Sequence, residues 1–216
     1  MNPTKCSNRR IIGLTGGIAT GKTTVSDYLG TVYQLPILDA DIYAKEAVVV
    51  GSPLLETITE HFGSDILLSD STLNRQHLGQ IVFSHPDERQ WLEKLIHPYV
   101  RDHLVEAIHE SSAQTIVLVV PLLFEAKMTD LVTEIWVVYC SNQQQIERLM
   151  QRSELTQLKQ IPEAPPSKTL TREAAQARID SQMPIAEKCK LADVVLDNSS
   201  TKEDLLKQVD EAIKLR

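Results

Sequence analysis

Residues 10–24 read RIIGLTGGIATGKTT, a short apolar run followed by a glycine-rich turn, a lysine and two threonines. The apolar run predicts a buried strand, and the spacing of Val25, Tyr28 and Leu29 predicts a helix over residues 21–31. Residues 16–23 match G-x-x-x-x-G-K-[ST], the pattern of a loop whose backbone N–H groups surround phosphate. Such a loop needs a strand before it and a helix N-terminus after it, and the sequence predicts both.

The loop also predicts the groups that bind a nucleoside triphosphate. Lys22 can reach the β- and γ-phosphates, and the Thr23 hydroxyl can ligate Mg²⁺. We therefore expect ATP as co-substrate and Mg²⁺ as the metal. The loop residues expected to bind ATP are Gly17, Ile18, Ala19, Thr20, Gly21, Lys22, Thr23 and Thr24.

Three other nucleotide-binding classes lack their characteristic residues in this chain. A dinucleotide site needs G-x-G-x-x-G, which the spacing of these glycines does not supply. No tyrosine is followed four residues later by lysine, as a short-chain dehydrogenase requires, and no guanine-reading N-K-x-D occurs. A kinase that acts on a small molecule is the class that remains.

Composition indicates an ordinary globular protein. The 216 residues are 42% hydrophobic and 24% charged, with a net charge of −7, so a broad nucleic-acid surface is not expected. The cysteines are Cys6, Cys140 and Cys189, too far apart for a C-x-x-C pair, which favours a reducing compartment. The apolar run after the polar first ten residues is too short for a signal peptide or a membrane span. We expect a cytoplasmic protein with no membrane, nucleic-acid or obligate protein partner.

Four further strands are predicted over residues 35–39, 115–120, 134–139 and 193–197. They are apolar on both faces and alternate with helical stretches, which is typical of a mostly parallel α/β sheet covered by helices on both sides. Residues 42–113 form a long helical excursion, with helices expected near 54–62, 76–83 and 87–109. A Pro-rich mobile loop or lid is expected over 153–167, and a closing amphipathic helix over 201–215.

Charged residues at two other places are candidates for the site. Asp39 and Asp41 follow the second predicted strand, where one carboxylate could accept a substrate proton and the other could hold Mg²⁺ through water. The alternative is a helix N-cap followed by a solvated acid. Arg148 and Arg152 share one helix face and could neutralise phosphates, although a solvated face is the alternative. At His97-Pro98 a proline at a helix start is expected, with a structural histidine.

Taken together, these motifs resemble the dephospho-coenzyme A kinase family over almost the whole chain. The matching segments are GLTGGI (13–18), KTT (22–24), LDAD (38–41), LNR (73–75), HP (97–98), VPLLFE (120–125), Arg148 with Arg152, ARI (177–179) with Gln182, and Ala192-Asp193 with Asn198. The loop alone is common to many enzymes. The LDAD, HP and PLLFE segments, in this order and at these distances, are much more specific.

The resemblance implies a P-loop kinase that transfers the γ-phosphate of ATP to the ribose 3′-hydroxyl of dephospho-CoA, the last step of coenzyme A synthesis. It implies one domain over residues 10–216. Its parts are a core (about 10–41, 114–147 and 190–216), an acceptor-binding helical region (about 42–113) and a lid (about 148–180). Asp41 is the implied base, with Lys22 as the other catalytic residue. Arg148, Arg152 and Asn198 complete the ATP site, and Asp39, Asp41, His97 and Leu122 are assigned to the acceptor.

The sequence departs from the family pattern at two places. Ala19 and Thr20 stand where the family most often has Gly-Ser, so Ala19 has either a negative φ or mild strain. The lid segment 154–168 is longer than usual. Two rival functions also remain: a P-loop kinase for a nucleoside, nucleotide or sugar, and a nucleotide sensor that phosphorylates nothing.

Overall fold

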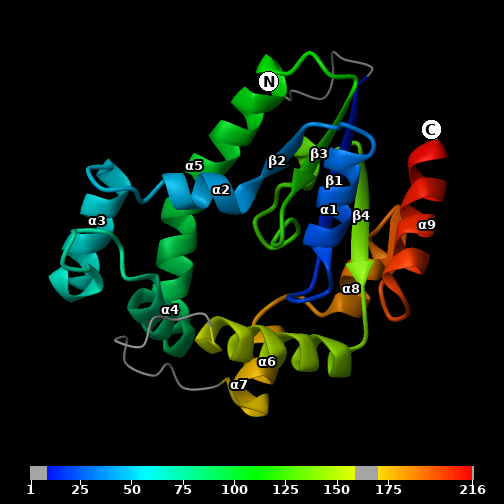
Figure 1. The fold of residues 1–216 in the computed structure, drawn as a ribbon. Coiled ribbons are helices and arrows are strands. Elements are labelled where there is room, and N and C mark those ends of the chain that lie inside the picture. Colours follow the sequence, from blue (N-terminus) through cyan, green and yellow to red (C-terminus); the bar gives the residue numbers. More distant parts are fainter. Residues whose placement is uncertain (1–8, 159–169, 216) are drawn as a thin grey trace. The chain divides into compact units, whose positions relative to one another are not determined.

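A computed structural model describes residues 9–158 and 170–215, and its sheet has five strands (Figure 1). The strands are β1 (Arg10–Gly16), β2 (Ile37–Asp39), β3 (Thr115–Val119), β4 (Glu134–Tyr139) and β5 (Val194–Asp197). Their order is β2-β3-β1-β4-β5, so the strand that leads into the phosphate loop is central. β1 runs parallel to β3 and β4, and β4 runs parallel to β5. The predicted five-stranded, mostly parallel sheet is confirmed.

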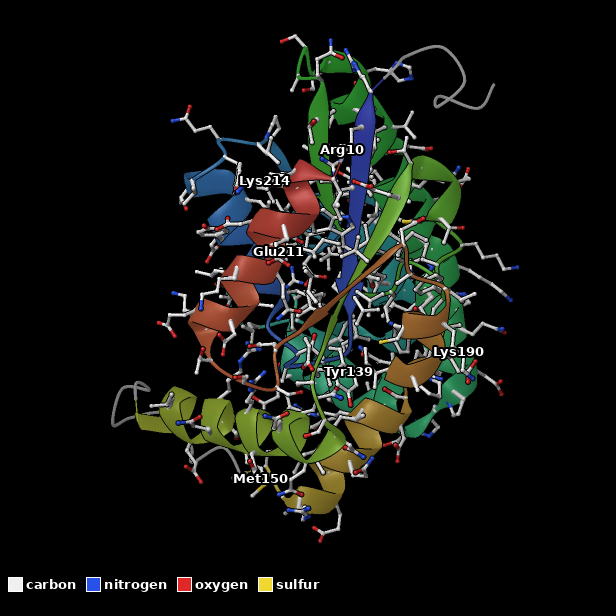
Figure 2. The ribbon with its side chains drawn as sticks, turned by 90° about the vertical axis from the view of Figure 1, so that its right-hand side faces the viewer. Arg10, Tyr139, Met150, Lys190, Glu211 and Lys214 are labelled. Atoms are coloured by element: carbon white, nitrogen blue, oxygen red, sulfur yellow. The ribbon has the colours of Figure 1, made fainter. Side chains whose placement is uncertain are left out.

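The sheet is apolar on both faces because helices cover both. Ile12, Leu14 and Trp136 are fully buried within one core cluster. Helices α1 (Lys22–Thr31) and α9 (Lys202–Lys214) cover one face, and α8 (Ile185–Lys190) covers the other (Figure 2). The amphipathic spacing of the C-terminal segment explains α9, which buries Leu205 and Val209.

Helix α6 (Asn142–Leu158) begins just after β4, beyond the carboxyl end of that strand, and α7 (Arg172–Asp180) packs against it. The prediction of a loop from residue 153 is wrong at its start, because α6 continues through Leu158. No proline occurs between Asn142, where α6 begins, and Pro162, so no proline ends the helix at residue 153. The Pro-rich part of the predicted lid, residues 159–169, lies outside the described residues.

The chain divides into two compact units, one of residues 1–38 with 113–216 and one of residues 39–112. The second unit holds α2 (Ala40–Glu46), α3 (Pro53–Phe62), α4 (Arg75–Ser84) and α5 (Pro86–Glu110). Its own core includes the fully buried side chains of Ile58 and Ile66. The three helices predicted in this region are confirmed by α3, α4 and α5.

The prediction that Pro98 begins a helix is wrong. Pro98 lies inside α5, which begins instead at Pro86, where the missing N–H of proline costs nothing. An interior proline removes one helical hydrogen bond and usually destabilises a helix by about 3 kcal/mol. Burial of Val100, Leu104 and Ile108 on the following turns supplies packing that offsets this cost. Within residues 9–158 and 170–215, no helix has the length and apolar character needed to cross a membrane.

Candidate active site

The phosphate loop joins β1 to α1 and takes backbone conformations that demand glycine at two positions. Gly16 has φ 147° and Gly21 has φ 105°, both in the left-handed region. A Cβ on Gly16 would collide with the carbonyl oxygen of Val138 on β4, and one on Gly21 would collide with the side-chain amide of Asn198. The loop therefore lies directly against the neighbouring strand and the turn after β5, which explains the glycines of the motif.

Ala19 adopts φ 59°, so the strained alternative holds for this residue. A left-handed conformation costs an L-residue roughly 1–2 kcal/mol. Its side chain is only 6% exposed and packs in a small apolar cluster with Ile146, Leu149 and Ala175 from α6 and α7. Burial of the methyl group offsets part of the strain.

Lys22 and Thr23 stand at the first turn of α1. The Lys22 Nζ donates to the carbonyl oxygens of Gly17 at 2.7 Å and Gly16 at 3.2 Å, so the ammonium group lies across the loop. The Thr23 side chain is exposed. The fully buried Thr20 donates its hydroxyl to the Gly17 carbonyl at 2.9 Å, which ties the two ends of the turn together.

Side chains from α6 and from the turn after β5 hold the far side of the loop. Arg148 donates to the carbonyl oxygens of Thr20 at 3.3 Å and Asn198 at 2.8 Å, and the Asn198 amide also donates to Thr20 at 2.8 Å. Arg148 thus bonds to the loop backbone itself. Arg152, one turn further along α6, is exposed.

These groups border a cavity of 210 Å³ beside the loop. Its lining consists of Ala19, Gly21, Thr24, Arg148, Gln151, Arg152, Leu155 and Asn198. Six of these eight residues were predicted to bind ATP from the sequence. The site therefore brings the loop together with the α6 arginines and Asn198, each of which lies more than a hundred residues after the loop in the chain.

Four polar residues, Gln182, Glu125, Lys188 and Gln145, were not predicted as site residues. Gln182 accepts a hydrogen bond from the Ile18 N–H at 3.1 Å, and the fully buried Lys188 pairs with Glu125 at 2.9 Å. Glu125 and Gln182 occur within the motifs that carry the family resemblance, so that pattern could have marked them. Lys188 has no comparable sequence signal. The buried Gln145 lies behind Gly17, and its Oε1 finds no hydrogen-bond partner among the described residues.

Asp39 and Asp41 belong to the helical unit, at the start of α2. The Asp39 carboxylate accepts from the Asp41 N–H at 2.8 Å and so is the N-cap of α2. Asp39 is therefore a helix N-cap, as one of the two sequence interpretations expected. The cap uses one lone pair of the carboxylate and leaves the others available for further partners. Capping also fixes the direction of the Asp39 side chain.

The other two residues assigned to the acceptor fall in different units. His97 lies on α5, where partial burial lowers the pKa of its imidazole and favours the neutral ring. Leu122 lies in the turn after β3, in the sheet unit. Neither position tests a role in acceptor binding.

Oxygen ligands for Mg²⁺ are present, but the described residues supply no complete set of ligands. Within the described part of the chain, no group of three or more His, Cys, Asp and Glu side chains could hold a metal ion. Mg²⁺ usually binds through one or two carboxylates, water and the phosphates of its substrate. The Thr23 hydroxyl, in the sheet unit, and the Asp39 carboxylate, in the helical unit, are each donors of this hard, oxygen type, so either residue by itself fits a partly provided site.

Comparisons with known proteins place this geometry among kinases of one family. Residues 10–204 match the family model described as Dephospho-CoA kinase. The dephospho-CoA kinase of Trichormus variabilis is 58% identical over 205 residues, which cover 95% of this chain and 97% of that relative. A solved structure from Thermus thermophilus, TT1252, superposes with a TM-score of 0.77 at 31% identity, covering 97% of this chain and all of that one. Dephospho-CoA kinase from Campylobacter jejuni gives a TM-score of 0.64 at 26% identity, covering 94% and 95% of the two chains.

Proposed function

This chain belongs to the dephospho-CoA kinase family, and on that premise we propose how its residues share the reaction. The reaction transfers the γ-phosphate of ATP to the ribose 3′-hydroxyl of dephospho-CoA and gives coenzyme A and ADP. The observation that carries the function is the phosphate loop with Lys22 across it, within a chain that matches the family from residue 10 to residue 204.

The phosphate loop binds ATP, and Lys22 neutralises its β- and γ-phosphates. In the structure the Lys22 ammonium donates to two loop carbonyls, which are weaker acceptors than a phosphate oxygen. Phosphate replaces these carbonyls as the partner of Lys22. A cation fixed there stabilises the charge that spreads over the transferred phosphoryl group.

The cavity lined by Ala19, Arg148 and Asn198 receives the rest of the nucleotide. Support for this role comes from its position beside the loop and from the exposed guanidinium of Arg152 on its border. Arg148 acts from the loop backbone, and Arg152 supplies a second positive charge one helical turn away. Asn198 stands nearest the base.

Asp41 accepts the proton of the attacking ribose hydroxyl, and Asp39 orients the start of α2. The support is that α2 directly follows β2, and ligands of parallel α/β sheets bind beyond the carboxyl ends of the strands. A carboxylate suits this task because phosphoryl transfer passes through a loose transition state and needs only late removal of the proton. His97 and Leu122 belong to the acceptor side.

The Thr23 hydroxyl would hold Mg²⁺ together with the ATP phosphates, and Asp39 would act on Mg²⁺ only through water. Bound there, Mg²⁺ would neutralise charge on the β- and γ-phosphates. We also propose a cytoplasmic location. Its support is the pair of unbridged cysteines, Cys140 and Cys189, which suits a reducing compartment.

The deciding experiment measures ADP release by the full chain with ATP, with and without dephospho-CoA. We expect ADP release that depends on dephospho-CoA and is much faster than release without an acceptor. A panel of nucleosides, nucleotides and sugars in place of dephospho-CoA is the control. Faster turnover of a panel member would identify another kinase, and binding of ATP with no acceptor-dependent release would identify a nucleotide sensor.

A further inference from the structure

The linker of residues 181–184, between α7 and α8, is bonded to the phosphate loop on one side. The Ile18 N–H donates to Gln182 Oε1 at 3.1 Å. On the other side the next residue along, Met183, donates its N–H to Glu125 Oε1 at 2.9 Å. The linker therefore connects the phosphate loop to the turn that follows β3. The proposed binding of ATP uses none of these contacts.

A buried cation anchors the far end of this connection. Lys188 is fully buried on α8, and its Nζ lies 2.9 Å from Glu125 Oε1 and donates to the Pro121 carbonyl at 3.0 Å. A buried charge is tolerated only when it is paired and hydrogen-bonded, so Lys188 fixes both groups in place. The same Pro121 carbonyl accepts from the fully buried Thr15 hydroxyl at 3.1 Å. Through Thr15 the contacts return to β1, the strand that leads into the loop.

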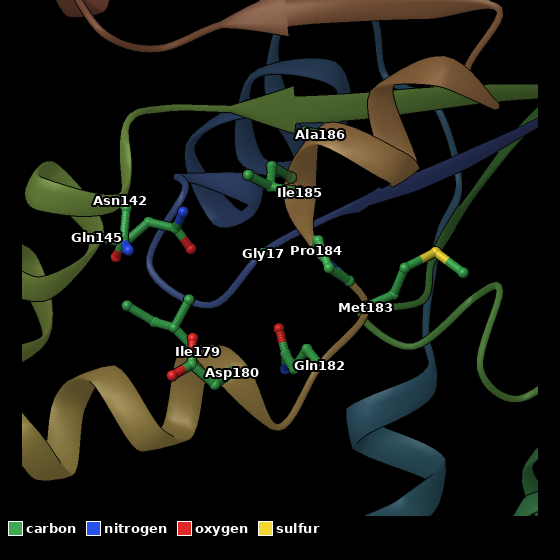
Figure 3. A pocket seen from close by; sticks show the side chains of 10 residues that line it. All are labelled: Gly17, Asn142, Gln145, Ile179, Asp180, Gln182, Met183, Pro184, Ile185 and Ala186. Atoms are coloured by element: carbon green, nitrogen blue, oxygen red, sulfur yellow. The ribbon is translucent and has the colours of Figure 1, made fainter.

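One side of the linker is not packed against other side chains but borders a cavity. A cavity of 290 Å³ lies between the linker, the start of α6 and Gly17 (Figure 3). Gln182 and Met183 line it together with Gln145. A side chain that borders a cavity has lost dispersion contacts on that side. The hydrogen bonds at Ile18 and Glu125 therefore join the linker to the phosphate loop and to the turn after β3, in addition to the backbone bonds that tie its ends to α7 and α8.

We infer that residues 181–184 are a strut that sets the position of the phosphate loop. Gln182 is its positioning residue at the loop, and the Lys188–Glu125 pair is its anchor. Donors that are already in place bind phosphate without the cost of ordering them. The inference rests on the proposed function, because the property that the strut controls is affinity for the phosphates of ATP.

The test replaces Gln182 by methionine, which keeps the length of the side chain and removes the acceptor. We expect a rise of about three- to tenfold in KM for ATP and in the calorimetric Kd for ADP, the usual worth of one hydrogen bond. We expect kcat to change less than KM. Hydrogen exchange at the Ile18 amide, measured by NMR, becomes faster. Gln182→Glu keeps an acceptor oxygen and restores the protection of the Ile18 amide, whereas its negative charge beside the loop keeps the affinity for ATP and ADP low.

Gln145→Met is the matched control. It is the same substitution, beside the same loop and on the same cavity, at a glutamine that makes no hydrogen bond to the loop in the structure. We expect its KM for ATP to stay within about twofold of the original. Equal effects of the two methionine variants would overturn the inference, as would an unchanged Ile18 amide in Gln182→Met. Gln182→Asn withdraws the acceptor by one methylene and repeats the test if the methionine variant does not fold.

The anchor is tested by Lys188→Met, alone and combined with Gln182→Met. Because Lys188 acts through the strut, the double variant should raise KM for ATP little beyond the larger single effect. Fully additive effects would show that Lys188 has no part in positioning the loop. Failure of the proposed function can be told apart from failure of the strut inference. If the proposed function is wrong, the original chain releases no ADP that depends on dephospho-CoA. ADP binding and Ile18 exchange would still decide about the strut.

Discussion

The phosphate loop and the start of α2 both carry polar residues just after a strand, but hydrogen bonds of different range hold the two segments in place. At the start of α2 the partner is local, because Asp39 accepts from the N–H of Asp41 two residues away. In the loop the partners are distant, since Ile18 and Thr20 bond to side chains 164 and 178 residues further along the chain. The contact at the start of α2 lies within a single turn. The loop depends on the folding of the whole sheet unit, and remote substitutions should disturb it.

The largest effect is expected at the loop itself. Lys22→Ala removes the cation that faces the transferred phosphoryl group, so kcat/KM for ATP should fall by about 10³–10⁵-fold. Coupled measurement of ADP release checks this. The melting temperature should change much less than kcat/KM, because the hydrogen bonds from the Lys22 ammonium to the Gly16 and Gly17 carbonyls lie within the loop itself. Turnover near the original rate would contradict the role of the loop.

Asp41→Asn tests the local region. It keeps the shape of the side chain and removes its basicity, so kcat should fall by about 10²–10⁴-fold with little change in ATP affinity. Steady-state kinetics and calorimetry with ATP separate the two quantities. Asp39→Asn is the control: raised Mg²⁺ should partly restore its turnover and should not restore that of Asp41→Asn. The opposite pattern would mean that the two roles are exchanged.

Arg148→Ala tests whether the loop depends on distant support. The variant loses two charge-assisted hydrogen bonds to loop and turn carbonyls, so KM for ATP should rise about tenfold and the melting temperature should fall. Arg152→Ala is the comparison on the same helix face. It should slow turnover without lowering the melting temperature, because the Arg152 side chain is exposed. If Arg148→Ala and Arg152→Ala lowered the melting temperature equally, Arg148 would have no special part in supporting the loop.

Ala19→Gly should have the smallest effect, although it lies in the middle of the loop. Glycine relieves the left-handed strain of roughly 1–2 kcal/mol but loses a buried methyl group and gains freedom in the unfolded chain. These terms oppose each other, so the free energy of unfolding should change by no more than about 1 kcal/mol. Urea denaturation measures it. A larger loss would mean that the cluster with Ile146 and Leu149 outweighs the strain.

The same contrast explains what the sequence could predict. Each strand, the loop and α1 can be recognised from apolar periodicity or glycine placement within its own short segment, and all were predicted correctly. Residues 153–158 and Pro98 were assigned wrongly, because a polar stretch and a proline are weak local signals that tertiary packing overrides. The bonds from Gln182 and Lys188 have no local pattern at all. Their partners are fixed by the order of strands in the sheet.

The central position of β1 has a consequence for synthesis on the ribosome. β1 is made first, yet it lies between β3 and β4, whose residues follow more than a hundred positions later. Its loop is completed only when Gln182 and Asn198 have emerged. A nascent chain therefore exposes an apolar strand with two unpaired edges for most of its translation, a state prone to aggregation. Productive folding of this unit therefore waits until residues as far along as Asn198 are available, and shielding of residues 10–16 by a chaperone should raise its yield.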